Sequence, residues 1–129
     1  MTRAPRNARE KKLRARGFGR RGEWAALAWL ALKRYRVLAR NFSAPGGEID
    51  IVAQKGDTIA FVEVKARPSV EAARTAISAE KRRRVSRAAR SWLSRNRWAA
   101  GYCLRADAMF ISPRRWPEHL ESAFELDLS

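Results

Sequence analysis

The sequence predicts an α/β protein with the order helix, three strands, helix, and one or two further strands. Two observations support this prediction. Segments with a helical spacing of apolar residues enclose segments in which apolar and charged residues alternate, the period of a strand. In addition, Gly56-Asp57 is typical of the two-residue turn of a β-hairpin. The 129 residues are enough for one domain with a modest core.

The expected elements follow in order along the chain. A first helix over residues 22–35 carries Leu27, Leu30 and Ala31 at inward spacing. A second helix over residues 78–97 has Ser78 as its N-cap and an apolar face around Val85. Strands are expected at 37–42, on either side of Gly56-Asp57, at 102–111 and, shorter, around Phe124. The apolar run 24–32 is about half the length of a membrane span, so we expect no membrane insertion.

Net charge indicates the kind of partner. The chain has 28 Lys and Arg against 13 Asp and Glu, a net charge of +15. This excess favours a polyanion, most simply nucleic acid, although anionic membrane and ribosome surfaces remain open. Residues 1–17 are basic and poor in large apolar residues, so we expect a disordered tail there and a single domain over 18–129.

The hairpin carries charged residues where a core is expected. Alternation places Glu48 and Asp50 on one face of its first strand, with Ile49 and Ile51 on the other, and puts Glu63 and Lys65 on one face of its second strand. A two-residue turn sets Asp50 opposite Glu63 and Glu48 opposite Lys65. The first pair is then non-hydrogen-bonded, with Cα atoms roughly 4.5 Å apart.

Two readings of these charges stay open. Carboxylates so close repel each other unless a cation or a proton lies between them, and converging oxygen ligands suit a hard divalent ion such as Mg²⁺. Alternatively, they form an ordinary cross-strand ion network on a solvated face, in which Glu48 pairs with Lys65 and Asp50 is exposed.

The second helix separates its charges by face. Lys81 lies four residues before Val85 and therefore on the inward stripe. Arginines that lie mostly outside this stripe could follow a phosphate backbone or form a solvated helix face; they are Arg82, Arg83, Arg84, Arg87 and Arg90. In the first helix, Glu23 extends the buried stripe, which favours a site facing the sheet over simple helix-dipole chemistry.

The remaining reactive residues exclude several classes of site. The single Cys103 rules out an internal disulfide, fits a reducing cytoplasm and is expected to be a buried structural thiol. With one Cys and one His, no Cys/His zinc cluster can form. Arg105 and Asp107 share a strand face and are expected to pair with each other.

The element order, with an acid on the first helix and charged residues on the second and third strands, resembles the PD-(D/E)XK nuclease superfamily. More closely, the chain resembles the YraN family of small bacterial proteins over residues 18–112. The matching residues are Gly22-Glu23, Asn41, Gly47-Glu48-Ile49-Asp50, Phe61-Val62-Glu63-Val64-Lys65 with Arg67, Lys81 and Arg105-Ala106-Asp107. The proline that precedes the metal-binding aspartate in the superfamily is Ile49 here, a change that leaves the carboxylate in place.

The resemblance implies a restriction-endonuclease-like core, a mixed β-sheet flanked by helices, with the site at a splayed edge of the sheet. It implies that Asp50 and Glu63 bind Mg²⁺ or Mn²⁺, with Glu23 completing the shell directly or through water. Lys65 would orient or deprotonate the attacking water. Glu48, Lys81 and Arg105 would support site electrostatics or strand positioning, and Arg67 would join the helix arginines in binding nucleic acid.

Three functions follow as hypotheses. The first is a metal-dependent nuclease that acts on DNA in DNA processing or repair, alone, as a homodimer or with a protein partner. The second is a non-catalytic nucleic-acid-binding module. The third is a protein that docks onto a ribosome or repair complex through its basic tail.

Overall fold

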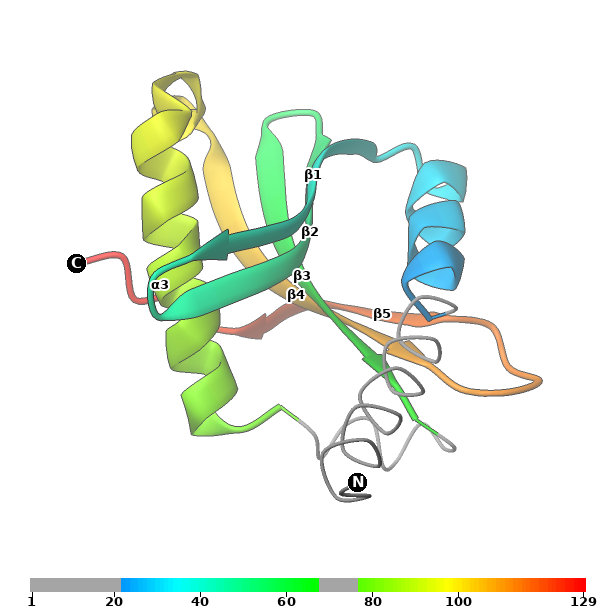
Figure 1. Cartoon of the computed structure of the whole chain (residues 1–129). Coiled ribbons are helices and arrows are strands. Elements are labelled where there is room, and N and C mark those ends of the chain that lie inside the picture. The colour runs from blue at the N-terminus through cyan, green and yellow to red at the C-terminus, as the bar shows by residue number, and fades with distance from the viewer. Residues whose placement is uncertain (1–21, 68–76) are drawn as a thin grey trace, which may run out of the picture.

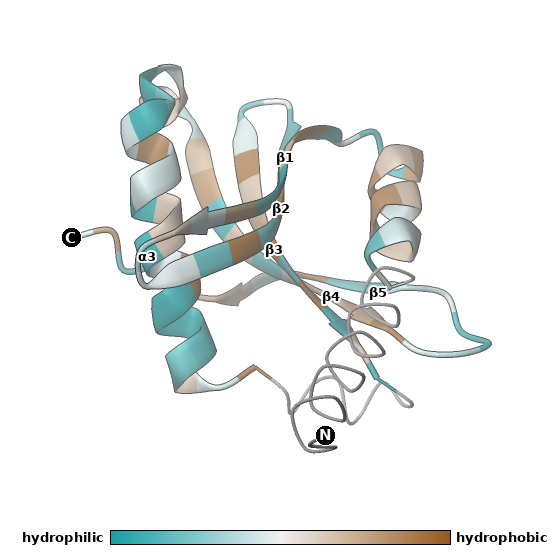
Figure 2. Ribbon diagram, in the orientation of Figure 1, coloured by the Kyte–Doolittle hydropathy of each residue, from teal (hydrophilic) through white to brown (hydrophobic). Residues whose placement is uncertain are grey.

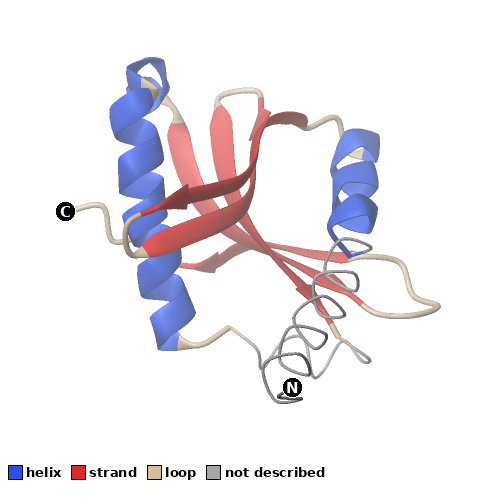
Figure 3. Cartoon of the chain, in the orientation of Figure 1, coloured by secondary structure: helices blue, strands red, loops and turns tan. Residues whose placement is uncertain are grey.

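The computed structural model describes residues 22–67 and 77–129, in which five strands form one mixed sheet with a helix against each face (Figure 1, Figure 3). The predicted fold class and element order are confirmed, whereas the expected tail 1–17 lies outside the described residues. A helix over residues 22–32 is followed by β1 (Arg36–Ala44), β2 (Gly47–Lys55), β3 (Thr58–Ala66), α3 (Ala79–Arg95), the 3₁₀ helix η1 (Arg97–Gly101), β4 (Cys103–Ile111) and β5 (Glu118–Phe124).

The sheet has the strand order β1-β2-β3-β4-β5. All neighbouring pairs are antiparallel except β3 and β4, which are parallel. Parallel neighbours cannot be joined by a tight turn. The connection through α3 and η1 therefore leaves the end of β3 and returns to the start of β4, and this places α3 against one face of the sheet (Figure 1).

The first helix ends earlier than its apolar pattern predicts. The Tyr35 amide donates to the Leu30 carbonyl at 2.9 Å and the Arg34 amide to the Ala31 carbonyl at 3.0 Å. With Arg34 at φ 67°, this is a Schellman end, which stops the helix at residue 32 instead of 35. Among the described residues, no helix has both the length and the apolar character needed to cross a membrane.

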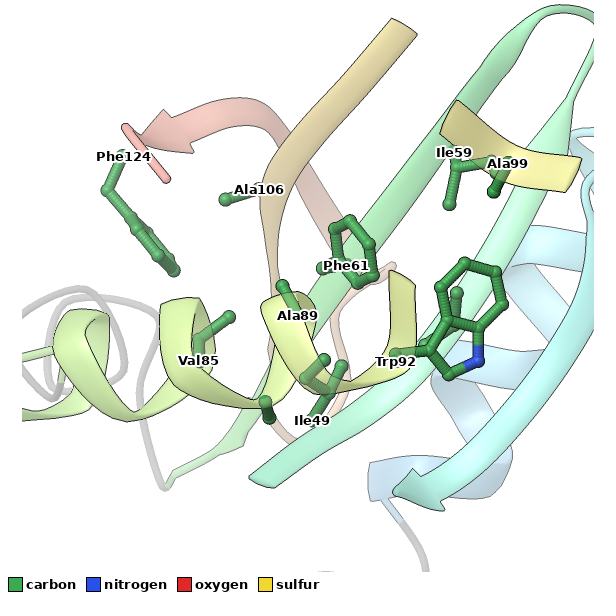
Figure 4. Close-up of a cluster of buried hydrophobic side chains, with 11 residues drawn as sticks. Ile49, Ile59, Phe61, Val85, Ala89, Trp92, Ala99, Ala106 and Phe124 are labelled. Atoms are coloured by element: carbon green, nitrogen blue, oxygen red, sulfur yellow. The ribbon is translucent and has the colours of Figure 1, made fainter. Parts of the chain in front are cut away.

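Two apolar clusters fill the two faces of the sheet. The α3-side cluster joins α3 to β2, β3 and β4, and in it Phe61 and Trp92 meet edge to face with ring centroids 5.8 Å apart (Figure 4). The opposite cluster buries Ala26 and Leu30 of the first helix against Val62 and neighbouring residues of the sheet. Removal of these side chains from water is the main force that holds both helices to the sheet.

Strand β2 twists strongly at its start, which corrects the predicted alternation. Ile49 belongs to the α3-side cluster, whereas Ile51, two residues later, belongs to the opposite cluster. A flat strand would put both on one face. The start of β2 curves toward α3 (Figure 1), and Gly47 permits this because a Cβ there would lie 2.0 Å from the Arg84 carbonyl oxygen.

Candidate active site

The hairpin register is the predicted one, but strands β2 and β3 part where the carboxylates lie. Lys55 pairs with Thr58, and the ladder continues to Ile51 opposite Val62. In an unbroken ladder, the Val64 amide would next donate to the carbonyl of residue 49. It donates instead to Oδ2 of Asp50 at 2.7 Å. A side-chain carboxylate thus replaces a main-chain acceptor at the point of divergence.

Glu63 is the centre of a buried cluster of charges. Its Oε1 lies 3.1 Å from Nζ of Lys65 and 3.5 Å from Nζ of Lys81. The side chains of Glu63 and Lys65 are only 4% and 5% exposed, while that of Lys81 is 35% exposed. Two residues apart on β3, Glu63 and Lys65 share the strand face that looks toward α3. Buried ions of this kind are tolerated only when they are paired.

Lys81 of helix α3 contacts this cluster. The Ser78 hydroxyl accepts a hydrogen bond from the Lys81 amide at 3.2 Å, so the predicted N-cap is confirmed. The helix begins at residue 79, and Lys81 in its first turn points inward, as its spacing from Val85 predicted. The first turns of α3 are otherwise strongly hydrophilic (Figure 2).

Electrostatic coupling joins Asp50 to the same cluster. Burial, together with the negative charge of Glu63, raises the pKa of Asp50 to about 7. The Val64 amide and the two lysines oppose this rise. Burial, followed by the adjacent Lys81 amine, lowers the pKa of Lys65. The cluster therefore places a carboxylate with a raised pKa beside an amine with a lowered pKa.

The donor set suits a hard divalent cation. Asp50 and Glu63 offer carboxylate oxygens close enough to repel each other, and a cation between them would remove the repulsion that raises the Asp50 pKa. Within the described ranges 22–67 and 77–129, no group of three His, Cys, Asp or Glu side chains is arranged to hold a metal ion.

Glu23 reaches the sheet but contacts β1. Its Oε1 accepts from Nδ2 of Asn41 at 3.0 Å and lies 3.4 Å from Arg40. The side chain is 13% exposed, so the expected inward direction is correct. Gly22 allows the helix to lie close to the end of β3, because a Cβ there would lie 2.6 Å from the Cβ of Ala66.

Two of the predicted supporting residues lie elsewhere. Glu48 is 53% exposed and 4.0 Å from Arg84, so the predicted pairing of Glu48 with Lys65 is wrong. At this point β2 has left β3, and Glu48 is opposite Ser43 on β1. Arg105 pairs with Asp107 at 2.7 Å, as predicted, but alternation places both on the face of Met109, which is opposite α3. Strand positioning is the role that this placement leaves for Arg105.

The pairing of Arg105 with Asp107 extends into a network that sequence reasoning missed. Nε2 of His119 on β5 donates to Oδ2 of Asp107 at 2.7 Å, and Nδ1 of the same ring lies 2.7 Å from Nζ of Lys33. Tyr35 accepts from Arg105 at 2.6 Å. The network ties β4 and β5 to the end of the first helix. A lone histidine in a polar segment gave no signal of these contacts.

The expectation of a buried Cys103 is wrong, because the thiol is exposed at the start of β4.

The predicted phosphate-binding arginines lie mainly on the outer surface. Arg67 is exposed, and its guanidinium donates to the Ala66 carbonyl at 2.8 Å. Of the five predicted arginines on α3, four are exposed (Arg82, Arg83, Arg84 and Arg87) and Arg90 is half-buried. The exposed arginines thus lie on the outer side of α3, whereas Lys81 in its first turn contacts Glu63.

Comparison with known proteins assigns the family. Residues 22–111 match the uncharacterised protein family UPF0102. A UPF0102 protein of Methylobacterium nodulans is 56% identical over 131 residues, covering 100% of both chains. One of Methylorubrum extorquens is 56% identical over 125 residues, which is 97% of this chain and 98% of the relative. The chain belongs to the UPF0102 family, the YraN family of the restriction-endonuclease-like superfamily that its charged motifs resemble.

Proposed function

We propose that this protein is a metal-dependent nuclease that hydrolyses phosphodiester bonds in DNA. The observation that carries the proposal is the cluster of Asp50, Glu63 and Lys65 at the divergence of β2 and β3. A buried carboxylate and a buried lysine lie there beside the half-buried Asp50, although burial of charge is costly without a function or a partner. A net charge of +15 supports a polyanionic substrate.

Asp50 and Glu63 would hold Mg²⁺ or Mn²⁺ through their carboxylate oxygens. Bound there, the cation would polarise a phosphoryl oxygen and lower the pKa of a water molecule. Glu63 would turn from its lysine partners toward the cation, and Asp50 would give up the proton that its raised pKa favours. Because Glu23 is held by β1, its contribution would pass through water.

Lys65 would accept the proton of the attacking water. Burial and the Lys81 amine lower the pKa of Lys65, and in its neutral form the amine would accept a proton as the water oxygen bonds to phosphorus. The bond from phosphorus to the leaving ester oxygen then breaks, and that oxygen takes up a proton. Lys81, more exposed on α3, would keep its charge and face a phosphate oxygen.

Cleavage assays with purified protein test the proposal. Labelled linear, nicked and branched DNA would be incubated with increasing Mg²⁺ or Mn²⁺. We expect metal-dependent cleavage that falls by about 10²-fold or more in Asp50→Asn and Glu63→Gln, the scale of lost acid–base and metal catalysis. Glu48→Gln, an exposed acid on the same strand as Asp50, is the matched control and should cleave normally. Absence of cleavage with every substrate and metal would contradict the proposal.

A non-catalytic nucleic-acid-binding module is the second candidate, and one observation favours it. Glu63 is already neutralised by two lysines within 3.5 Å, as in a purely structural ion network. Such a module would bind DNA without an effect of metal. Its affinity would fall in Arg83→Ala or Arg87→Ala and would not change in Asp50→Asn.

A further inference from the structure

The arginine-rich face of α3 is partly covered by the chain's own C-terminal segment, residues 125–129. A groove between them is lined by Arg82, Arg83, Ser86, Arg87 and Arg90 on one side and by Glu125 and Asp127 on the other. Two main-chain bonds hold the segment in place. The Asp127 amide donates to the Ser86 hydroxyl at 3.0 Å, and Arg90 donates to the Asp127 carbonyl.

The segment shows the alternation of a strand that lies on a surface. Leu126 and Leu128 pack against the α3-side cluster, whereas Glu125 and Asp127 are exposed. Its two apolar side chains therefore anchor it, and its two carboxylates add negative charge at the rim of a basic groove. Carboxylate and phosphate are both oxyanions, and guanidinium groups bind both.

Three arginines of the groove form a row along α3. Arg83, Arg87 and Arg90 are spaced i, i+4 and i+7, so they form one row about 10 Å long on the helix. A row of this length can contact neighbouring phosphates of one nucleic-acid strand. Arg87 donates to the Gly46 carbonyl at 3.2 Å, and Arg83 donates to Glu80 at 2.9 Å, so both contacts restrict these side chains.

We infer that the groove of α3 binds the sugar-phosphate backbone of nucleic acid and that residues 125–129 act as an internal competitor for it. This inference rests on the nucleic-acid part of the proposed function. It adds the groove of α3 as the place where the strand binds, and residues 125–129 as the segment that occupies this groove in the free protein. Displacement of the segment would break the bond between Asp127 and Ser86 and remove Glu125 from the rim. The affinity of the full chain for nucleic acid would therefore rise when either the Asp127–Ser86 hydrogen bond or the charge of Glu125 is lost.

Two variants of the full chain, each with a matched control, test the inference. Glu125→Gln removes one rim charge, and Asp57→Asn removes one exposed charge in the distant β2–β3 turn. Ser86→Ala removes one of the two bonds to the segment without a change of charge, and Ser94→Ala removes an exposed hydroxyl of the same helix that, within the described part of the chain, bonds only to Ser91. The readouts are the salt concentration at which each protein elutes from immobilised heparin and its affinity for a labelled duplex oligonucleotide.

We expect Glu125→Gln to elute at higher salt than Asp57→Asn, and Ser86→Ala at higher salt than Ser94→Ala. For DNA, the slope of log affinity against log salt should steepen by about one for each additional phosphate that the protein neutralises. Elution of either variant at the same salt concentration as its control would overturn the inference. Elution shifts as expected, combined with no metal-dependent cleavage, would retain the groove and contradict the proposed nuclease, so the two failures are distinguishable.

Discussion

The side chain of Asp50 accepts the main-chain amide of Val64 at 2.7 Å, in place of the carbonyl that a regular hairpin would offer. This bond fixes one carboxylate oxygen of Asp50 at the position where β2 and β3 separate. The carboxylate can therefore approach Glu63 without the loss of a main-chain hydrogen-bond partner. This hydrogen bond therefore holds Asp50 close to Glu63 at the point where the two strands separate.

The pKa of Asp50 leads to a prediction about stability and pH. Its value of about 7 in the folded protein lies above the ordinary 3.8 of the unfolded chain. Between these values the folded state binds the proton and the unfolded state does not, so this residue lowers stability as pH rises from about 4 to 7. We expect Asp50→Asn, which keeps an acceptor for Val64, to be more stable than the wild type at pH 8, by roughly 1–4 kcal/mol.

Urea unfolding of both proteins at pH 5 and pH 8 measures this difference. The advantage of the variant should be larger at pH 8, because Asp50 is largely protonated at pH 5. An equal difference at both values would show that Asp50 does not titrate in this range.

The two lysines beside Glu63 should contribute unequally to stability. Lys65→Met removes a partner that is 5% exposed, and Lys81→Met removes one that is 35% exposed. Loss of a deeply buried partner leaves Glu63 poorly compensated, so we expect Lys65→Met to cost about 3 kcal/mol and Lys81→Met about 1 kcal/mol. Denaturant titration at pH 7 measures both. The reverse order would mean that Lys81 is the main counterion.

Gly47 should be indispensable for the contact between β2 and α3. A Cβ at this position would lie 2.0 Å from the Arg84 carbonyl and 3.0 Å from the Ala88 amide, both main-chain atoms that cannot move freely. We expect Gly47→Ala to destabilise the protein by about 3 kcal/mol or more. Gly101→Ala, with nothing within 4 Å, is the control and should change stability little. Thermal unfolding of the two variants tests this contrast.

Local patterns predicted much of the fold. The turn at Gly56-Asp57 fixed the register of β2 on β3, since a two-residue loop leaves little choice of pairing. The spacing between Lys81 and Val85 predicted that Lys81 points inward because both lie on one helix. These predictions succeeded because each depends on residues close together in the chain.

Predictions that depend on distant residues did worse. Alternation assumes a flat strand, so it missed the twist that puts Ile49 and Ile51 on opposite faces of the sheet. The same twist carries Glu48 away from Lys65, the partner that the flat register predicts. His119 meets Lys33, 86 positions away, through the pairing of β5 with β4. No local pattern contains such a contact. Similarly, Cys103 lies in an apolar run but begins its strand at an exposed position.

Binding of a divalent cation by Asp50 and Glu63 is the central claim, and titration calorimetry with Mn²⁺ tests it most directly. We predict one saturable site in the wild type and in Glu48→Gln, and its loss in Asp50→Asn and in Glu63→Gln. Saturating cation should also raise the wild-type melting temperature and leave that of Glu63→Gln unchanged. Equal Mn²⁺ binding by all four proteins, or by none of them, would contradict the assignment of these two carboxylates as metal ligands.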